Sequence, residues 1–153
     1  MNVEPHKTTA KMGTAELTIV CRPADTDRVP RPRVLFVDDN ITHLDLYTIV
    51  LQRDLDVLTA TRGETGYALA CTEHPDAIVI DCIMPDSDGL AICERLLANP
   101  DTGSIPLVVL TGDDGAFVRA MAMRSLSAVL MKPCPAATLL HTIHQALSIR
   151  TTR

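Results

Sequence analysis

The sequence predicts a three-layer α/β protein in which helices cover both faces of a doubly wound parallel sheet. Five short runs rich in β-branched and aliphatic residues alternate with segments in which apolar residues recur at helical spacing. Four of the five runs are apolar almost throughout, as expected for strands that are covered on both sides. Crossovers between parallel strands are right-handed, and this places the helices on the two faces of the sheet.

The predicted strands are recognised by their composition. They read VLFV, DVLTA, AIVI, PLVVL and AVLM, at residues 34–37, 56–60, 77–80, 106–110 and 128–131. DVLTA mixes polar and apolar residues, so we expect it near an edge of the sheet.

The segment after the first strand predicts an amphipathic helix. Its apolar face is formed by residues three or four positions apart, namely Ile41, Leu44, Tyr47 and Leu51. Thr42 and Asp45 have the spacing of a capping box, which predicts that they form the start of this helix. His43 is near the acidic residues that follow the strand, and we expect it on the helix surface.

Four more helices are predicted after the other strands. Two have clear apolar faces, formed by Leu90, Cys93 and Leu97 and by Leu139, Ile143 and Leu147, with Pro135 suited to the first position of the last helix. The other two, near residues 64–73 and 114–125, have weaker patterns. The first contains Gly66, and the second is rich in methionine and alanine.

Composition limits the function classes. The 153 residues suit one domain, and 46% hydrophobic with 22% charged residues exclude a disordered chain. A net charge of −5 and 3% aromatic residues argue against direct nucleic-acid binding. No apolar run approaches the roughly 20 residues of a membrane span, and the start lacks the pattern of a secretory signal. Five cysteines without a CxxC pair suggest free thiols, so we expect a cytoplasmic protein.

The two ends differ from the middle of the chain. Residues 1–32 hold four prolines and one short apolar run, Glu16 to Cys21, which predicts a tail or linker with at most one weak strand. We expect one folded domain over residues 33–150 and a short C-terminal tail over 151–153. Two roles stay open for the first segment: extension of the sheet through its apolar run, or pairing of two copies in a homodimer.

Chemically active side chains follow four of the five predicted strands. Asp38 and Asp39 follow the first strand, Asp81 the third, Thr111 the fourth and Lys132 the fifth. Ligands of open parallel sheets bind outside the carboxyl ends of the strands. We therefore expect three carboxylates, a hydroxyl and an ammonium group at one edge of the sheet.

This set of groups suits phosphoryl chemistry. Three neighbouring carboxylates repel one another unless they are protonated or bind a cation, and Mg²⁺ prefers such oxygen ligands. One carboxylate can act as the nucleophile and form an aspartyl phosphate. The Lys132 ammonium and the Thr111 hydroxyl would then stabilise the phosphoryl oxygens.

Four motifs resemble the receiver domain of response regulators in two-component signalling: VLFVDDN, IVIDCIMPDSDGL, VVLTG and VLMKP. The resemblance spans about residues 33–150 and implies that Asp81 is the phosphoacceptor. It implies that Mg²⁺ is bound by Asp39 directly, by Asp38 partly through water, by Asp81, and by the backbone carbonyl of Ile83. Thr111 and Lys132 would be the switch hydroxyl and the lysine that contacts the phosphoryl group.

The resemblance also implies a fold and partners. The fold is flavodoxin-like, a (βα)5 sandwich with strand order 2-1-3-4-5, and the Lys132–Pro133 peptide is often cis in this family. The phosphoryl group would come from a histidine of a sensor histidine kinase or a histidine phosphotransfer protein. Phosphorylation would switch the face of helix 4, strand 5 and helix 5 toward a downstream protein partner.

Such a chain would catalyse only the transfer of a phosphoryl group to its own Asp81, and its self-dephosphorylation stays open. We therefore do not expect a conventional enzyme. One position departs from the family pattern, because Val129 stands where an aromatic residue is usual. This keeps a second hypothesis, a pseudo-receiver that binds partners without phosphorylation. A third hypothesis is a haloacid-dehalogenase-like Mg²⁺ phosphatase. It is disfavoured because Asp38-Asp39-Asn40 lacks the DxD pattern and no acid follows Lys132.

Overall fold

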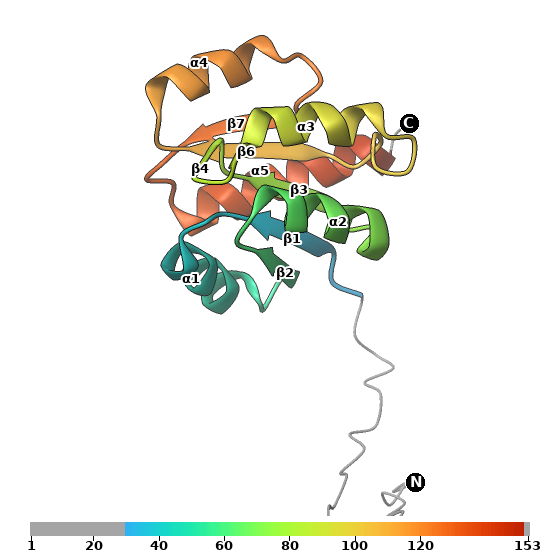
Figure 1. Ribbon diagram of the computed structural model, residues 1–153. Helices are drawn as coiled ribbons and strands as arrows, with labels where there is room; N and C mark the ends of the chain where they lie inside the picture. The colour runs from blue at the N-terminus through green and yellow to red at the C-terminus, as the bar shows by residue number, and fades with distance from the viewer. Residues whose placement is uncertain (1–29, 152–153) are drawn as a thin grey trace, which may run out of the picture. The chain divides into compact units, whose positions relative to one another are not determined.

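The computed structural model describes residues 30–151 and confirms the predicted sandwich (Figure 1). Its main sheet has five parallel strands in the order β2-β1-β3-β6-β7, which is the predicted order 2-1-3-4-5 when the sheet strands alone are counted. These strands are β1 (Arg33–Val37), β2 (Asp56–Ala60), β3 (Ala77–Ile80), β6 (Leu107–Thr111) and β7 (Ala128–Met131).

Helices cover both faces of this sheet. α1 (Ile41–Leu51) and α5 (Ala136–Thr151) pack on one face, whereas α2 (Gly63–Glu73), α3 (Gly89–Ala98) and α4 (Asp114–Ala122) pack on the other, as Figure 1 shows. Within the described residues, no helix has both the length and the apolar character needed to cross a bilayer. The apolar run at Glu16 to Cys21 and residues 152–153 lie outside the described part, so the proposed tails stay predictions.

The central strands alternate between the two layers of the core. In β1, Val34 and Phe36 face the α1–α5 layer, while Leu35 and Val37 face the layer of α2, α3 and α4. β3 and β6 alternate in the same way and are also buried throughout. Successive side chains of a strand point to opposite faces, so a strand covered on both sides must be apolar at every position.

The start of α1 differs from the prediction. Ile41 is 63% exposed, whereas Leu44, Tyr47 and Leu51 are buried as predicted. β1 ends at Val37, so the first turn of α1 lies where the strand beneath it has ended. The capping box is also wrong: Asn40 is the N-cap, and its side chain accepts hydrogen bonds from the backbone N–H groups of Thr42 and His43.

Two features near the strand ends were not predicted. β6 is shifted by one residue from the predicted 106–110, so Thr111 is its last residue and pairs with Met131. β4 (Ile83–Met84) and β5 (Ser87–Asp88) form a short antiparallel pair directly after Asp81. Strands of two residues are too short to produce a periodic pattern in the sequence. The Lys132–Pro133 peptide is cis, as the resemblance implies.

Gly89, the first residue of α3, holds the chain after Asp81 in place. Its N–H donates to the carbonyl oxygen of Cys82 at 2.8 Å. A Cβ atom built on Gly89 would lie 1.9 Å from the carbonyl oxygen of Asp81 and 2.9 Å from Cα of Cys82. Both neighbours are backbone atoms, so only a residue without a side chain allows the two segments to approach this closely.

We expect Gly89→Ala to lower the free energy of unfolding by about 3 kcal/mol, because the added methyl group must displace backbone. Urea denaturation followed by circular dichroism measures this change. Gly112→Ala is the matched control, since its Cβ would meet only Cβ of Lys132 at an ordinary 3.7 Å. Equal stability of the two variants would show that the contact at Gly89 is not limiting.

Candidate functional site

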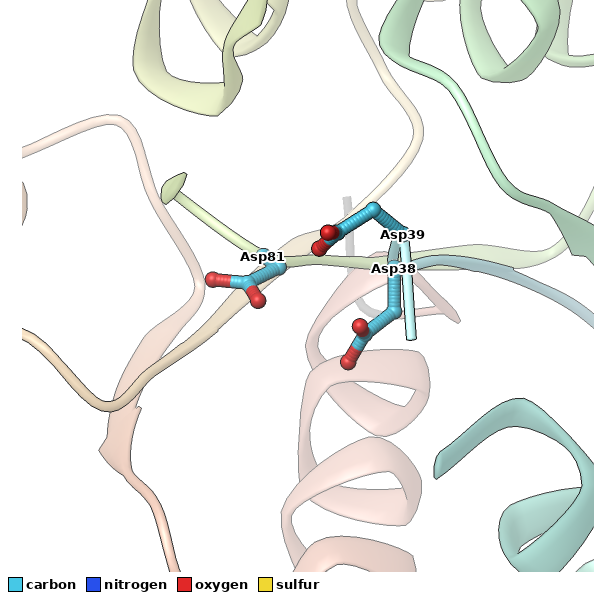
Figure 2. A group of neighbouring side chains, drawn as sticks. All are labelled: Asp38, Asp39 and Asp81. Atoms are coloured by element: carbon cyan, nitrogen blue, oxygen red, sulfur yellow. The ribbon is translucent and has the colours of Figure 1, made fainter. Parts of the chain in front are cut away.

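Three carboxylates meet at the carboxyl edge of the sheet (Figure 2). Asp38 and Asp39 directly follow β1, and Asp81 directly follows the neighbouring strand β3. One oxygen from each carboxylate lies within 4.8 Å of the others. Asp38 and Asp81 are buried, while Asp39 is exposed. The structure thus brings together the three acids that the sequence singled out.

Lys132 joins two of these acids. It is the first residue after β7, and its Nζ donates to Oδ2 of Asp38 at 2.7 Å and to Oδ2 of Asp81 at 2.8 Å. Burial disfavours the charged form of Lys132, but the hydrogen bonds to Asp38 and Asp81 outweigh it and raise the pKa of the ammonium group above its usual value. Lys132 is therefore a permanent positive charge between two buried carboxylates at neutral pH.

Two more groups lie within hydrogen-bonding distance of the Asp38 carboxylate. Its Oδ1 accepts from the backbone N–H of Asn40 at 2.8 Å, and its Oδ2 lies 3.2 Å from Nδ1 of His43. The sequence predicted a surface position for His43, and its side chain is 40% exposed. The contact with Asp38 could be suspected only from the position of His43 in the first turn of α1, five residues after Asp38.

Asp81 is held by the turn that follows it. Its Oδ1 accepts from the backbone N–H of Ile83 at 3.1 Å, and its Oδ2 accepts from Lys132. The side chain of Ile83 is exposed, at the start of β4. The carbonyl oxygen of Ile83 as a metal ligand stays a prediction.

Thr111 is completely buried at the end of β6. Its Oγ1 accepts from the backbone N–H of Asp113 at 3.2 Å, and Asp113 in turn caps α4 by accepting from Ala116. Beside Thr111, burial and then the charge of Asp81 raise the pKa of the Cys82 thiol to about 11, against a smaller lowering by the Thr111 hydroxyl. Cys82 is thus a free, neutral thiol at physiological pH.

The donor set fits a hard divalent cation. Asp38, Asp39 and Asp81 offer only oxygen ligands, and with Lys132 they carry a formal charge of −2. Mg²⁺ would neutralise this charge and relieve the repulsion among the carboxylates. Asp39 and Asp81 are the better direct ligands, because three donors already occupy the oxygens of Asp38.

Comparisons with known proteins bear on the family and the fold of the chain. The family model described as "Response regulator receiver domain" matches residues 34–144. The chain is 33% identical over 118 residues to Protein PilH of Pseudomonas aeruginosa, covering 76% of this chain and 98% of PilH. It is 37% identical over 103 residues to Response regulator PleD of Caulobacter vibrioides, covering 66% of this chain but only 23% of PleD.

Solved structures show the same fold. A response regulator receiver domain protein from Clostridium thermocellum superposes with a TM-score of 0.71 at 26% identity, over 79% of this chain and 98% of that one. Chemotaxis response regulator CheY4 of Vibrio cholerae gives a TM-score of 0.69 at 25% identity, over 76% of this chain and 99% of that one.

We expect Lys132→Met to lower the free energy of unfolding by about 3 kcal/mol, because two buried carboxylates lose their shared cation. Millimolar Mg²⁺ should restore part of this loss, since the cation binds only the folded site. Urea denaturation with and without Mg²⁺ measures both effects. Arg124→Met, at an exposed position, is the control. Wild-type stability of Lys132→Met in the absence of Mg²⁺ would contradict the expected role of the lysine.

Proposed function

The chain belongs to the response regulator receiver family, and from this premise we propose that it accepts a phosphoryl group from a partner's phosphohistidine onto Asp81. The family is one of signalling modules, so the haloacid-dehalogenase-like phosphatase is not retained. The observation that carries the proposal is the meeting of Asp38, Asp39 and Asp81 with Lys132 at one edge of the sheet.

In the proposed reaction, a carboxylate oxygen of Asp81 attacks phosphorus. The new O–P bond forms as the N–P bond to the donor histidine breaks, and the released imidazole nitrogen keeps the electron pair and takes a proton from solvent. Lys132 neutralises charge on the phosphoryl oxygens, because its ammonium already lies beside the attacking carboxylate. Bound Mg²⁺, held by Asp38, Asp39 and Asp81 with the Ile83 carbonyl, would supply further neutralisation of phosphoryl charge.

The response to phosphorylation would pass through Thr111. In the proposed switch its hydroxyl turns toward the phosphoryl group and pulls residues 111–117 toward Asp81. The hydrogen bond from Asp113 to Thr111 gives this movement a direct route to α4, because Asp113 caps that helix. Arg119 of α4 also pairs with Asp88 at 3.1 Å, so α4 is linked to the segment after Asp81 as well as to the end of β6.

Val129 changes how this switch is read out. It pairs with Val109 and packs, partly buried, against the core layer of α2, α3 and α4. A valine has one strongly preferred rotamer and no ring to move between buried and exposed positions. We therefore assign the readout to displacement of α4 itself, which would change the face formed by α4, β7 and α5.

The donor would dock on α1. Four aliphatic side chains of this helix are 43% to 66% exposed: Ile41, Leu46, Ile49 and Val50. Leu46, Ile49 and Val50 have i, i+3, i+4 spacing and share one face, while the opposite face of α1 is buried on the sheet. A helix that is apolar on both faces is expected to be covered on both. α1 begins directly after the acidic pair, so a histidine-bearing partner seated there reaches Asp81.

The proposal is tested by intact-mass analysis after incubation with Mg²⁺ and acetyl phosphate. We expect one added phosphoryl group that hydroxylamine removes, and no adduct for Asp81→Asn or without Mg²⁺. Acetyl phosphate serves because breaking its P–O bond releases acetate without a partner protein. Absence of an adduct, also with a phosphorylated donor protein, would support the pseudo-receiver hypothesis instead.

We expect Leu46→Gln and Ile49→Gln to slow phosphoryl transfer from the histidine-bearing partner about tenfold, the effect of losing a central apolar contact. Labelling by acetyl phosphate should stay within about twofold of wild type, because neither residue touches the acids. Val118→Gln, which replaces an equally exposed aliphatic residue on α4, is the control. Equal slowing by all three variants would remove α1 as the docking surface.

A further inference from the structure

His43 is fixed in place on α1 by packing and by the start of the helix. Its ring is tilted by 48° to that of Tyr47, with ring centroids 6.5 Å apart, and Tyr47 stacks on Phe36 in the core at 5.6 Å. Its Nδ1 faces Oδ2 of Asp38 at 3.2 Å, and its Nε2 faces Nδ2 of Asn40 at 3.5 Å. Both ring nitrogens therefore have a polar neighbour.

The cap of α1 decides which nitrogen carries the proton. Oδ1 of Asn40 accepts from the backbone N–H groups of Thr42 and His43 at 3.0 and 3.3 Å, which fixes the orientation of the Asn40 amide. The other end of this amide, Nδ2, can only donate, which favours an accepting Nε2 on His43. Nζ of Lys132, 3.4 Å from Nδ1, can also only donate, but it already donates to two carboxylate oxygens at 2.7 and 2.8 Å, and Oδ2 of Asp38 lies closer to Nδ1, at 3.2 Å. The neutral ring then carries its proton on Nδ1 and donates it to Asp38, which can only accept.

Lys132 and His43 both face Oδ2 of Asp38, but Lys132 also contacts Asp81. Nζ of Lys132 lies 3.4 Å from Nδ1 of His43, and both groups donate to Oδ2 of Asp38. Lys132 also donates to Asp81. The oxygens of a phosphoryl group bound to Asp81 would therefore compete with Asp38 for the hydrogen bonds of Lys132. Among the described side chains that contact Asp38, His43 is the donor that does not also bind Asp81.

We propose that His43 is a positioning residue for Asp38. Its Nδ1–H tautomer holds the buried carboxylate in the orientation that serves the metal site, and it continues to do so when Lys132 engages a phosphoryl group. The geometric part of this inference stands on the contacts alone, whereas its consequence for phosphotransfer rests on the proposed function. A hydrogen-bonding partner of a metal ligand commonly changes metal affinity by tenfold or more when it is removed.

The tautomer is tested first, on the metal-free full-length protein. Long-range ¹H–¹⁵N correlation spectra distinguish Nδ1–H from Nε2–H rings, and His43→Asn identifies the His43 signals by their loss. At a pH where the spectrum shows a neutral ring, we expect the Nδ1–H pattern for His43. His141, exposed on α5, should show the Nε2–H form that free histidine prefers. A predominantly Nε2–H ring at His43 would overturn the proposal.

Mg²⁺ affinity is measured next by isothermal titration calorimetry. We expect His43→Leu, which has no donor, to weaken Mg²⁺ binding about tenfold. His43→Asn should stay within about threefold, because its amide can place an N–H group where Nδ1 stands. His141→Leu makes the same replacement on an exposed helix far along the chain and should change nothing. Urea denaturation checks that all variants fold. Wild-type affinity of His43→Leu would contradict the positioning role.

Labelling by acetyl phosphate separates this inference from the proposed function. We expect the rate for His43→Leu to fall about tenfold and that for His43→Asn to stay near wild type. If wild type is labelled but His43→Leu matches it in both rate and Mg²⁺ affinity, the role of His43 is wrong and the proposed function stands. If wild type is labelled neither by acetyl phosphate nor by a phosphorylated donor protein, the proposed function fails, and the tautomer and Mg²⁺ affinity still decide the role of His43.

Discussion

The site depends on one electrostatic constraint, which is that two buried carboxylates share one ammonium group. Asp38 and Asp81 end neighbouring strands, and Lys132 comes from the edge strand on the far side of β6. Like charges in a poorly hydrated site repel strongly, so the fold is tolerable only with a cation between them. The same repulsion favours a divalent cation, because Lys132 leaves a formal charge of −2 among the groups. Structural stability and the proposed phosphoryl chemistry therefore depend on the same charges.

The surrounding backbone fixes the positions of these groups relative to one another. The apolar strands β1, β3 and β6 fix the positions of the residues that follow them, because each is packed on both faces. Gly89 permits the chain after Asp81 to fold back within van der Waals distance of the Asp81 carbonyl. Thr111 joins the end of β6 to the cap of α4. The strands thus hold the candidate reacting groups, and Thr111 links the end of β6 to α4, the helix through which we propose the signal leaves.

α1 is apolar both on the face that packs on the sheet and on the face that meets solvent. Its inner face packs Leu44, Tyr47 and Leu51 on the sheet, and its outer face keeps aliphatic residues in contact with solvent. The backbone N–H of its N-cap, Asn40, and the ring of His43 in its first turn both contact Asp38. A partner that covers α1 would therefore lie next to the groups that hold the acidic site. The proposed docking surface and the groups that contact Asp38 therefore belong to the same helix.

The sequence by itself determined the fold class, the strand order through its motifs, and the three acids, because strands buried on both faces and strand-end side chains leave strong local patterns. It did not determine the exposure of Ile41, the Asn40 cap, the β4–β5 pair or the contact of His43 with Asp38. Helical spacing places Ile41 with Leu44, but the ending of β1 at Val37 decides what lies beneath it. The bridge from Lys132 spans 94 positions to Asp38 and 51 to Asp81. Only the packed sheet brings such distant charges together. A hydrogen bond needs its two heavy atoms about 3 Å apart, and the spacing of residues along the sequence does not give that distance.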